Sequence, residues 1–259
     1  MRLINYRFQP EGDYLEVVAG GDLHIGHPCF SPKKAAAHQS YILSAPDRVT
    51  IDLGDPIENS LRDSVGAGVY EQTMRPRDQR REAKRYYWDI AEQGKLLGIC
   101  ESNHPERSVK AADDSPTEYL CEVLRTEFIR YQGVLAITVG NSAKGYTYLL
   151  HVRHFAGNAS TPEGILRQLR LKSMPVQGCD MHMAGHCHYY THEAVPIRVP
   201  DARHGKVREI EKHYATCSSF MDWDASYAEM KDYAPPLFGM LSIRLYRDHR
   251  EVEVKRLVY

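Results

Sequence analysis

Five short apolar segments of this 259-residue chain each end in a turn that carries histidine, aspartate or asparagine. Each segment is brief and rich in branched or aromatic residues, and a polar or glycine-containing turn follows it, which is typical of buried strands. We expect the turns after such strands to meet at one rim of a sheet, where α/β proteins commonly bind ligands. The five predicted strands are Leu15–Ala19, Arg48–Leu53, Leu96–Cys100, Thr147–Val152 and Asp180–Ala184.

Amphipathic segments lie between these strands. The segments Gln79–Gln93, Ser115–Phe128 and Thr161–Leu171 carry apolar residues at helical spacing, and the second begins with Ser-Pro-Thr-Glu, a capping box with proline at the first helical position. After Tyr190 the pattern predicts four more strands: Thr191–Val199, Val207–Cys217, Gly239–Tyr246 and Glu251–Tyr259. The fold class that we expect is α/β, a β-sandwich flanked by helices. Because the chain has no repeat, low-complexity tract or linker, residues 1–259 are predicted to form a single domain.

Composition narrows the classes of function. The 33 Lys and Arg and the 34 Asp and Glu nearly cancel, so overall charge predicts no polyanionic partner, and any nucleic-acid binding must come from a local patch. The first residues lack the pattern of a secretory signal, and no run approaches the ~18 apolar residues that cross a bilayer. Six scattered cysteines without a Cys-x-x-Cys pair predict free thiols in a reducing compartment. We therefore expect a cytoplasmic protein that does not bind membranes.

The polar turns share the chemistry of metal ligands. In Asp-x-His and His-x-His the two side chains are two residues apart, so in extended backbone both can reach one site, and the neighbouring glycines permit tight turns. Histidine, carboxylate and one amide oxygen suit Mn, Fe, Ni, Co or Zn. Seven ligands are too many for one tetrahedral zinc and suit two ions that share a carboxylate. The candidate ligands are Asp22, His24, Asp55, Asn103, His154, His186 and His188.

Each motif alone is a weak signal. Gly-Asp and Asp-x-His occur by chance in many proteins, and a lone strand histidine such as His151 or His182 is more often a core or surface residue than a ligand. The segment Gly-His-Cys-His also occurs in zinc ribbons, but the chain lacks their Cys-x-x-Cys partner. The ordered set of five motifs, each after a predicted strand, is what favours the metal site.

In this order the motifs resemble those of the calcineurin-like metallophosphoesterase superfamily, above all its small bacterial, phage-type and DNA-repair nuclease branches. The similarity extends from Asp22 to His188, about two thirds of the chain. It implies a β-sandwich flanked by helices with a dinuclear metal centre at the strand-end rim, manganese being the first expectation. It also implies that hydroxide generated by the metals attacks phosphorus and that His104 is the catalytic histidine. By the same resemblance Asp22, His24 and His188 would hold one ion, and Asn103, His154 and His186 the other, with Asp55 bridging.

Two motifs depart from the family pattern. The superfamily's Gly-Asn-His-Glu is here Ser102-Asn103-His104-Pro105-Glu106, so the acid that would brace His104 is displaced by one position and the orientation of His104 stays open. The fourth motif offers both His151 and His154, which a continuous strand would place on opposite faces. We choose His154 because it lies at the end of the predicted strand beside a loop, and His151 remains the alternative.

The substrate is less constrained than the metal site. The stretch 75–85 carries six basic and two acidic residues, which could follow a nucleic-acid backbone or form a solvated helix face. Arg107 is a candidate for substrate binding, with a structural ion pair as the alternative. Phe220, Trp223 and Tyr227 could stack a base, although a place in the core is favoured. The first expectation is a phosphodiesterase or nuclease that acts on DNA, RNA or a nucleotide. A phosphomonoesterase is second, and a non-catalytic binding module is the alternative of another class.

Overall fold

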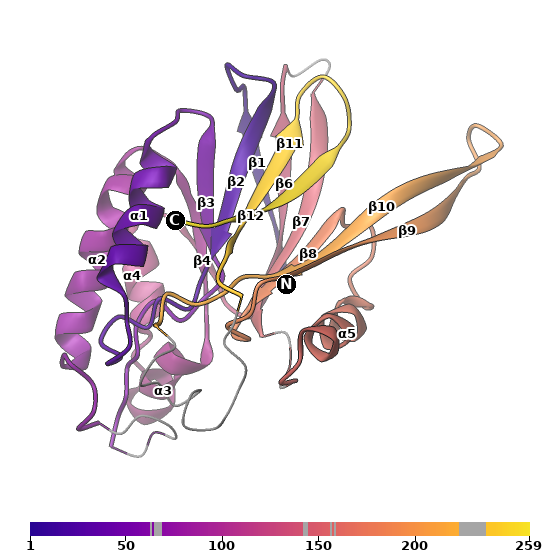
Figure 1. Cartoon of the computed structure of the whole chain (residues 1–259). Helices are drawn as coiled ribbons and strands as arrows, with labels where there is room; N and C mark the ends of the chain where they lie inside the picture. The colour runs from indigo at the N-terminus through magenta and orange to yellow at the C-terminus, as the bar shows by residue number, and fades with distance from the viewer. Residues whose placement is uncertain (63, 65–68, 142–144, 156, 158, 223–236) are drawn as a thin grey trace.

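Two six-stranded sheets form the body of the molecule in the computed structural model (Figure 1), which describes residues 1–62, 64, 69–141, 145–155, 157, 159–222 and 237–259. One sheet has the order β12 (Val252–Leu257), β11 (Met240–Tyr246), β2 (Tyr14–Gly20), β3 (Arg48–Asp52), β4 (Leu96–Cys100) and β5 (Glu127–Ile129). The other has the order β1 (Arg2–Phe8), β6 (Gln132–Val139), β7 (Tyr146–Phe155), β8 (Met181–Gly185), β10 (Lys206–Thr216) and β9 (Thr191–Asp201). The expected α/β class is therefore confirmed.

Parallel pairing positions the polar turns. In one sheet β2, β3 and β4 are parallel neighbours, and in the other β7 and β8 are parallel. The carboxyl ends of parallel neighbours lie at the same edge of their sheet. These are the five strands after which the sequence places candidate ligands, so the topology brings all of those turns to one end of the molecule.

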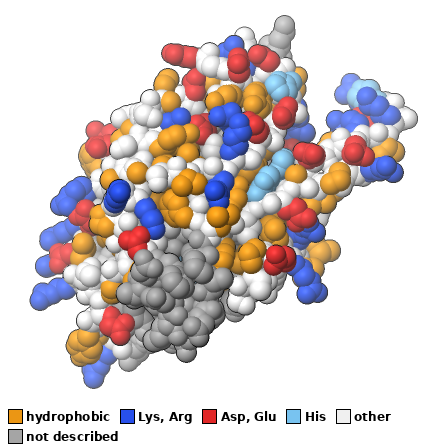
Figure 2. Space-filling model, viewed as in Figure 1, with side chains coloured by type: hydrophobic (Ala, Val, Ile, Leu, Met, Phe, Trp, Pro, Cys, Tyr) orange, Lys and Arg blue, Asp and Glu red, His pale blue; other side chains and the backbone are white. Residues whose placement is uncertain are grey.

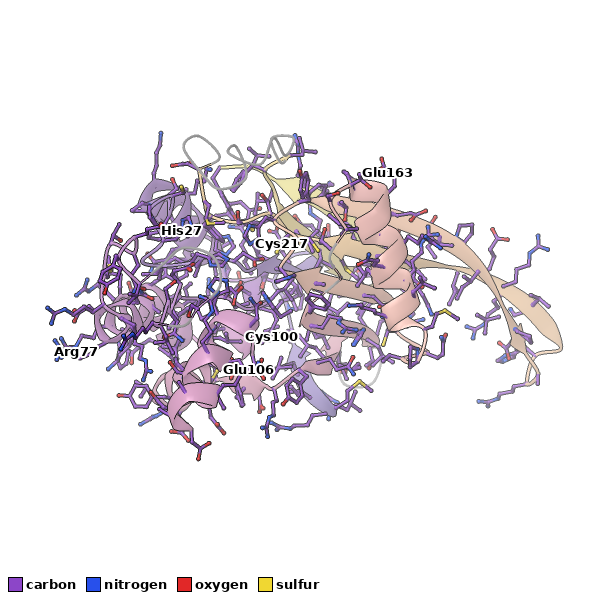
Figure 3. All side chains as sticks on the ribbon, turned by 90° about the horizontal axis from the view of Figure 1, so that it is seen from below. His27, Arg77, Cys100, Glu106, Glu163 and Cys217 are labelled. Atoms are coloured by element: carbon purple, nitrogen blue, oxygen red, sulfur yellow. The ribbon has the colours of Figure 1, made fainter. Side chains whose placement is uncertain are left out.

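The helices lie outside the sheets. The helices α1 (Pro32–Leu43), α2 (Pro76–Glu92) and α4 (Pro116–Leu124) lie over the sheet that contains β2, β3 and β4 (Figure 1). Seen from below, α3 (Asn103–Ala112) and α5 (Pro162–Ser173) lie on either side of the lower end of the molecule (Figure 3). The continuous core contains Ile51 of one sheet and Leu150 of the other, both fully buried. Burial of a side chain of this size stabilises the fold by about 1.5–3 kcal/mol.

The bounds of the five strands that precede the ligand turns differ from expectation by at most three residues, and the end of helix α4 is a larger correction. The predicted helix Ser115–Phe128 ends at Leu124, because Arg125 adopts a left-handed conformation and terminates it, and Phe128 belongs to β5. The beginning of α4 agrees with the prediction, since the Ser115 side chain accepts the backbone N–H of Glu118 at 3.1 Å. Such a cap stabilises a helix by about 1 kcal/mol. The elements α1, α3, β1, β5 and β6 were not predicted.

The structure bears on two expectations, the state of the cysteines and the lack of a membrane-spanning helix. All six cysteines are free thiols, and Cys100, Cys121, Cys179 and Cys217 are buried. None of the helices in the described part of the chain is long and apolar enough to cross a bilayer.

Candidate metal centre

All seven candidate ligands converge at the lower end of the molecule. Asp22 and His24 follow β2, Asp55 follows β3, and Asn103 is the first residue of α3 after β4. His154 lies in the last part of β7, and His186 and His188 follow β8. The side chains of Asp22, His24, Asp55 and His154 are almost completely buried. Carboxylates are rarely buried in this way without paired charges or metals, so the burial itself indicates a built site.

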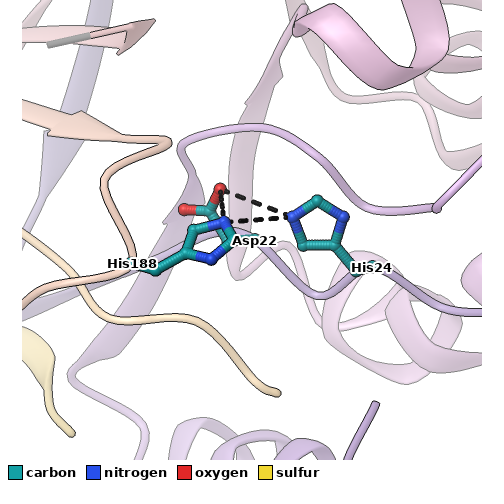
Figure 4. Close-up of side chains that lie close together, drawn as sticks. All are labelled: Asp22, His24 and His188. Atoms are coloured by element: carbon teal, nitrogen blue, oxygen red, sulfur yellow. Dashed lines mark hydrogen bonds and ion pairs between the residues drawn. The ribbon is translucent and has the colours of Figure 1, made fainter. Parts of the chain in front are cut away.

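Asp22, His24 and His188 form the first group (Figure 4). The Nε2 atoms of His24 and His188 are 3.2 Å apart, and Asp22 Oδ1 is 3.3 Å from His188 Nε2 and 3.8 Å from His24 Nε2. Ligands at the ~2.0–2.2 Å typical of metal–nitrogen and metal–oxygen bonds lie roughly 3 Å from one another. Three donor atoms at these separations are the spacing that one divalent ion requires.

Asp55, His154 and His186 form the second group. The Nε2 atom of His154 is 3.2 Å from Asp55 Oδ2 and 2.9 Å from the amide oxygen of Asn103, so Asn103 joins this group. Asp55 Oδ2 also lies 3.7 Å from His24 Nε2 of the first group. The Asp55 carboxylate therefore lies between the two groups, as a bridging ligand must.

The ring nitrogens that face away from the site fix the tautomers of two candidate ligands. His24 Nδ1 lies 3.0 Å from Glu58 Oε2, and His154 Nδ1 lies 2.8 Å from the carbonyl oxygen of Leu53. Each Nδ1–H donates to its oxygen, which leaves the Nε2 lone pair directed into the site. This is the usual arrangement of a histidine that binds a metal.

The backbone at the site is in a sparsely populated conformation. Among the described residues other than glycine, eight have a positive φ, and five of these are candidate ligands. Such conformations cost of order 1–3 kcal/mol each, and they persist where the surrounding structure holds them for a function. The five are Asp22 (φ 56°), His24 (49°), Asp55 (52°), His186 (70°) and His188 (57°).

Glycine is required beside two of the ligands. A Cβ atom on Gly54, whose φ is +111°, would lie 2.5 Å from His154 Nδ1. A Cβ atom on Gly185 would lie 2.9 Å from Asp22 Oδ2. Both distances are shorter than real contacts allow, so these two glycines let the turns approach the ligands.

Opposed charges set the protonation of the site. Burial alone would raise the pKa of Asp55, but the nearby His154 and His104 rings hold it well below its usual value. Burial would lower the pKa of His154, yet Asp55 raises it to about 9. By contrast, burial lowers the pKa of His186 to about 4, with a further contribution from His154. A cationic charge is thus favoured beside buried carboxylates, and a divalent ion would supply it and displace the ring protons.

Glu58 is a site residue that the sequence analysis missed. Its carboxylate is buried and lies 3.0 Å from His24 Nδ1 and 3.3 Å from His104 Nδ1. Glu106, the displaced acid of the sequence motif, is instead paired with Lys110 at 3.3 Å on the outer side of α3. Glu58 follows Asp55 by three residues, which was the only signal in the sequence, and nothing there showed that it turns inward. The orientation of His104, left open by the sequence, is therefore set by Glu58.

His104 lies between groups of opposite charge. Its Nδ1 donates to the carbonyl oxygen of Glu58 at 2.8 Å, and its Nε2 lies 3.3 Å from Arg107 Nη2 and 3.9 Å from Asp55 Oδ2. Burial lowers the pKa of His104, but Asp55 and Glu58 outweigh this and raise the pKa above its usual value. The His104 side chain is largely buried, with 15% of its surface exposed, and its raised pKa lets it hold a proton next to the site. Arg107 also donates to the Glu58 carbonyl oxygen at 3.1 Å, and its Nη1 lies 3.5 Å from Glu58 Oε1, so the ion-pair alternative has a structural basis.

The structure separates His154 from its alternative, His151. The strand β7 continues through both residues to Phe155 instead of ending before His154, with a register irregularity between Arg153 and Phe155. His151 points away from the candidate ligands, with Nδ1 2.9 Å from His182 Nδ1 and Nε2 3.1 Å from the Gln132 side chain. The predicted opposite faces explain why only His154 reaches the site.

The basic stretch 75–85 and the aromatic residues, considered above for substrate binding, give little support to a nucleic-acid substrate. On α2, Arg80 pairs with Asp114 and Arg81 with Asp78, and Lys and Arg line the edge of the molecule over this helix (Figure 2). Phe220 is fully buried and belongs to the core. Trp223 and Tyr227 lie outside the described residues.

Comparisons with known proteins give distant structural similarity. The chain matches no family model and no curated protein. A metallophosphoesterase of Sphaerobacter thermophilus is 13% identical with a TM-score of 0.43, over 94% of this chain and 89% of that chain. A conserved Streptococcus pneumoniae TIGR4 protein described as a predicted phosphoesterase is 10% identical with a TM-score of 0.35, over 94% and 98%. A Thermotoga maritima protein is 12% identical with a TM-score of 0.35, over 93% and 99%. Because these similarities are so distant, what the site can do is inferred from its own residues.

Proposed function

We propose that this chain is a phosphoesterase of the calcineurin-like type that uses two divalent metal ions. The observation that carries the proposal is the pair of ligand groups joined by Asp55, whose Oδ2 lies 3.2 Å from His154 Nε2 and 3.7 Å from His24 Nε2. The donor set of carboxylate, imidazole and amide oxygen fits Mn first, with Fe, Ni, Co or Zn compatible. Two such ions about 3.5–4 Å apart are suited to displacement at phosphorus.

The ions would supply positive charge for the phosphoryl oxygens and lower the pKa of the attacking water. The remaining steps belong to the chain. Asp22 and Asp55 are deprotonated at neutral pH, because the surrounding histidines lower their pKa values despite burial, so their own carboxylate oxygens are free to bind the ions. His104, with its raised pKa, holds a proton at the edge of the site and gives it to the departing alcohol oxygen.

We further propose that the substrate is a phosphodiester of a nucleic acid or a nucleotide, with a phosphomonoester second. Two side chains support binding of a phosphate at this edge, His104 and the adjacent Arg107, and the proposed ions would add positive charge beside them. The cations of α2 give weaker support, since Arg80 and Arg81 already have acidic partners. A binding module without catalysis is disfavoured because each of the seven candidate ligands contacts another member of the set or belongs to one of its groups.

The test compares hydrolysis of bis-p-nitrophenyl phosphate with that of p-nitrophenyl phosphate after loading with Mn²⁺. Hydrolysis of the diester supports the first proposal, and hydrolysis of the monoester alone supports the second. His104→Ala should keep its metal and lose most of its turnover, whereas loss of both ions in that variant would contradict the role given to His104. A wild-type protein that binds no metal and hydrolyses neither ester would instead support the binding module.

A further inference from the structure

His27 lies beside the candidate metal centre and belongs to neither ligand group. Three hydrogen bonds hold it in the loop between β2 and α1. Its backbone N–H donates to the His24 carbonyl oxygen at 2.8 Å, and its own carbonyl accepts the N–H of Phe30 at 3.0 Å. Its ring Nδ1 accepts the backbone N–H of Cys29 at 3.0 Å. The ring is therefore fixed in position before any substrate arrives.

The hydrogen bond from Cys29 also determines the tautomer of His27. Because Nδ1 is the acceptor, the proton of the neutral ring must be on Nε2. A ring protonated on both nitrogens could not accept this hydrogen bond, so the bond itself requires the neutral ring. Among the described residues none accepts a hydrogen bond from Nε2. Within that described part of the chain, His27 thus presents a fixed N–H donor without an acceptor, on a half-buried side chain.

The His27 ring lies close to the candidate metal centre. The rings of His24 and His27 are 6.3 Å apart between centroids and inclined at 67°. The ring of His104 lies 4.5 Å from that of His24, and Glu58 joins His24 to His104. His27 therefore lies next to the first ligand group, whereas Arg107 lies beyond His104.

We propose that His27 Nε2–H donates a hydrogen bond to a non-bridging oxygen of the substrate phosphoryl group. This inference rests on the proposed function and adds a substrate-binding residue to it. The donor is neutral and held by backbone hydrogen bonds, so it would orient the phosphoryl group without adding charge to a site that would already hold two cations. A pre-positioned donor of this kind contributes by orientation of the substrate.

The test uses two substitutions of one residue. His27→Phe keeps a ring and removes the donor, whereas His27→Gln can place an amide N–H near the position of Nε2. With Mn²⁺ bound, His27→Phe should lower kcat/KM for the preferred ester and the affinity for inorganic phosphate by roughly three- to tenfold, the range for one neutral hydrogen bond. His27→Gln should recover part of both losses. The control is His204→Phe, since His204 is exposed at the tip of the β9–β10 hairpin, far from the strand ends, and its loss should change neither quantity.

Metal content measured by elemental analysis separates the explanations. If His27→Phe binds both ions and loses phosphate affinity, the proposal is supported. If His27→Phe retains full phosphate affinity, or if it loses an ion, His27 does not act as a donor to substrate and the proposal is overturned. A wild-type protein that binds two ions and phosphate but hydrolyses no ester would refute the proposed function, while the phosphate affinities of the variants would still decide the role of His27.

Discussion

Replacement of Glu58 by glutamine tests how the site is held together. The Glu58 carboxylate lies 3.0 Å from His24 Nδ1 and 3.3 Å from His104 Nδ1, so one side chain orients a candidate ligand and the candidate proton donor. Residues that orient metal-binding histidines typically change metal affinity or activity by ~10–100-fold when replaced. We expect Glu58→Gln to lower kcat/KM by the same factor, about 1.4–2.7 kcal/mol of transition-state stabilisation. Glutamine keeps the size of the side chain, so the protein should stay folded.

The pH profile gives this experiment a second readout. Burial lowers the pKa of His104, and the carboxylates of Asp55 and Glu58 more than compensate, so its pKa is raised. Glu58→Gln removes one of these negative charges, and the pKa of His104 must then fall. Because His104 has to be protonated to assist the leaving group, the loss of activity at high pH should begin at a lower pH in the variant. Steady-state kinetics across pH 5–10 would measure the shift.

Glu106 provides the matched control. It is the acid that stands nearest to His104 in the sequence, but its carboxylate contacts Lys110, 3.3 Å away on the outer side of α3. Glu106→Gln should leave both kcat/KM and the pH profile unchanged. If Glu106→Gln were the damaging change and Glu58→Gln were silent, the assignment of Glu58 would be refuted.

Three further predictions concern the fold. Gly54→Ala should reduce metal content and Tm, because its Cβ atom would press on the ring of a candidate ligand, His154. Gly140→Ala has a similar φ of +100° but contacts of 3.4 Å or more, so it should lower Tm alone, and equal metal loss in both variants would contradict the steric reason. Burial lowers the pKa of His38 to about 3, whereas in the unfolded chain it is near 6.5. Above pH 6.5 the contribution of His38 to the free energy of unfolding is therefore constant, and below it this free energy falls by up to about 1.4 kcal/mol per pH unit as the pH drops toward 3. Urea unfolding of His38→Phe should show a smaller loss of stability over this range than the wild type. Among the described residues the buried Ser173 hydroxyl has no hydrogen-bond partner, so Ser173→Ala should leave Tm unchanged or higher. By contrast, Thr117→Val removes a 2.9 Å hydrogen bond to the buried Glu101 carboxylate and should cost about 1–3 kcal/mol. A large loss of Tm in Ser173→Ala would argue against this view.

Much of the fold could be predicted because local pattern and final structure agree. The segment Leu96–Cys100 is apolar throughout and forms β4 with the same bounds, and Ser115 caps α4 as its motif predicts. The helix α1 was missed because it buries only Ala35, His38 and Ile42, which leaves a weak apolar pattern. The strands β1 and β6 pair with each other over seven residues, a long-range partnership that neither segment reveals alone.

The sequence predicted the candidate ligands of the site but not the residues that orient them or lie beside them. Asp22 and His188 stand in short motifs whose spacing reflects their geometry, so the sequence points to them directly. The role of Glu58 depends on a loop that folds it under α3, where Asn59 donates to the His104 carbonyl oxygen at 2.9 Å. His27 depends on a hydrogen bond from the backbone of Cys29. Interactions of this kind arise from tertiary packing, and residue type and spacing do not encode them.

The metal content of the purified protein tests the central claim most directly. Elemental analysis after loading with Mn²⁺ and removal of free ions should give two ions per chain. Asp55→Asn should reduce this number, because Asp55 is the carboxylate that lies between the two ligand groups. A wild-type protein that retains two ions, with fewer in the variant, is the predicted result. A wild-type protein that retains none, or an Asp55→Asn variant that retains both as tightly as wild type, would contradict the two-metal account.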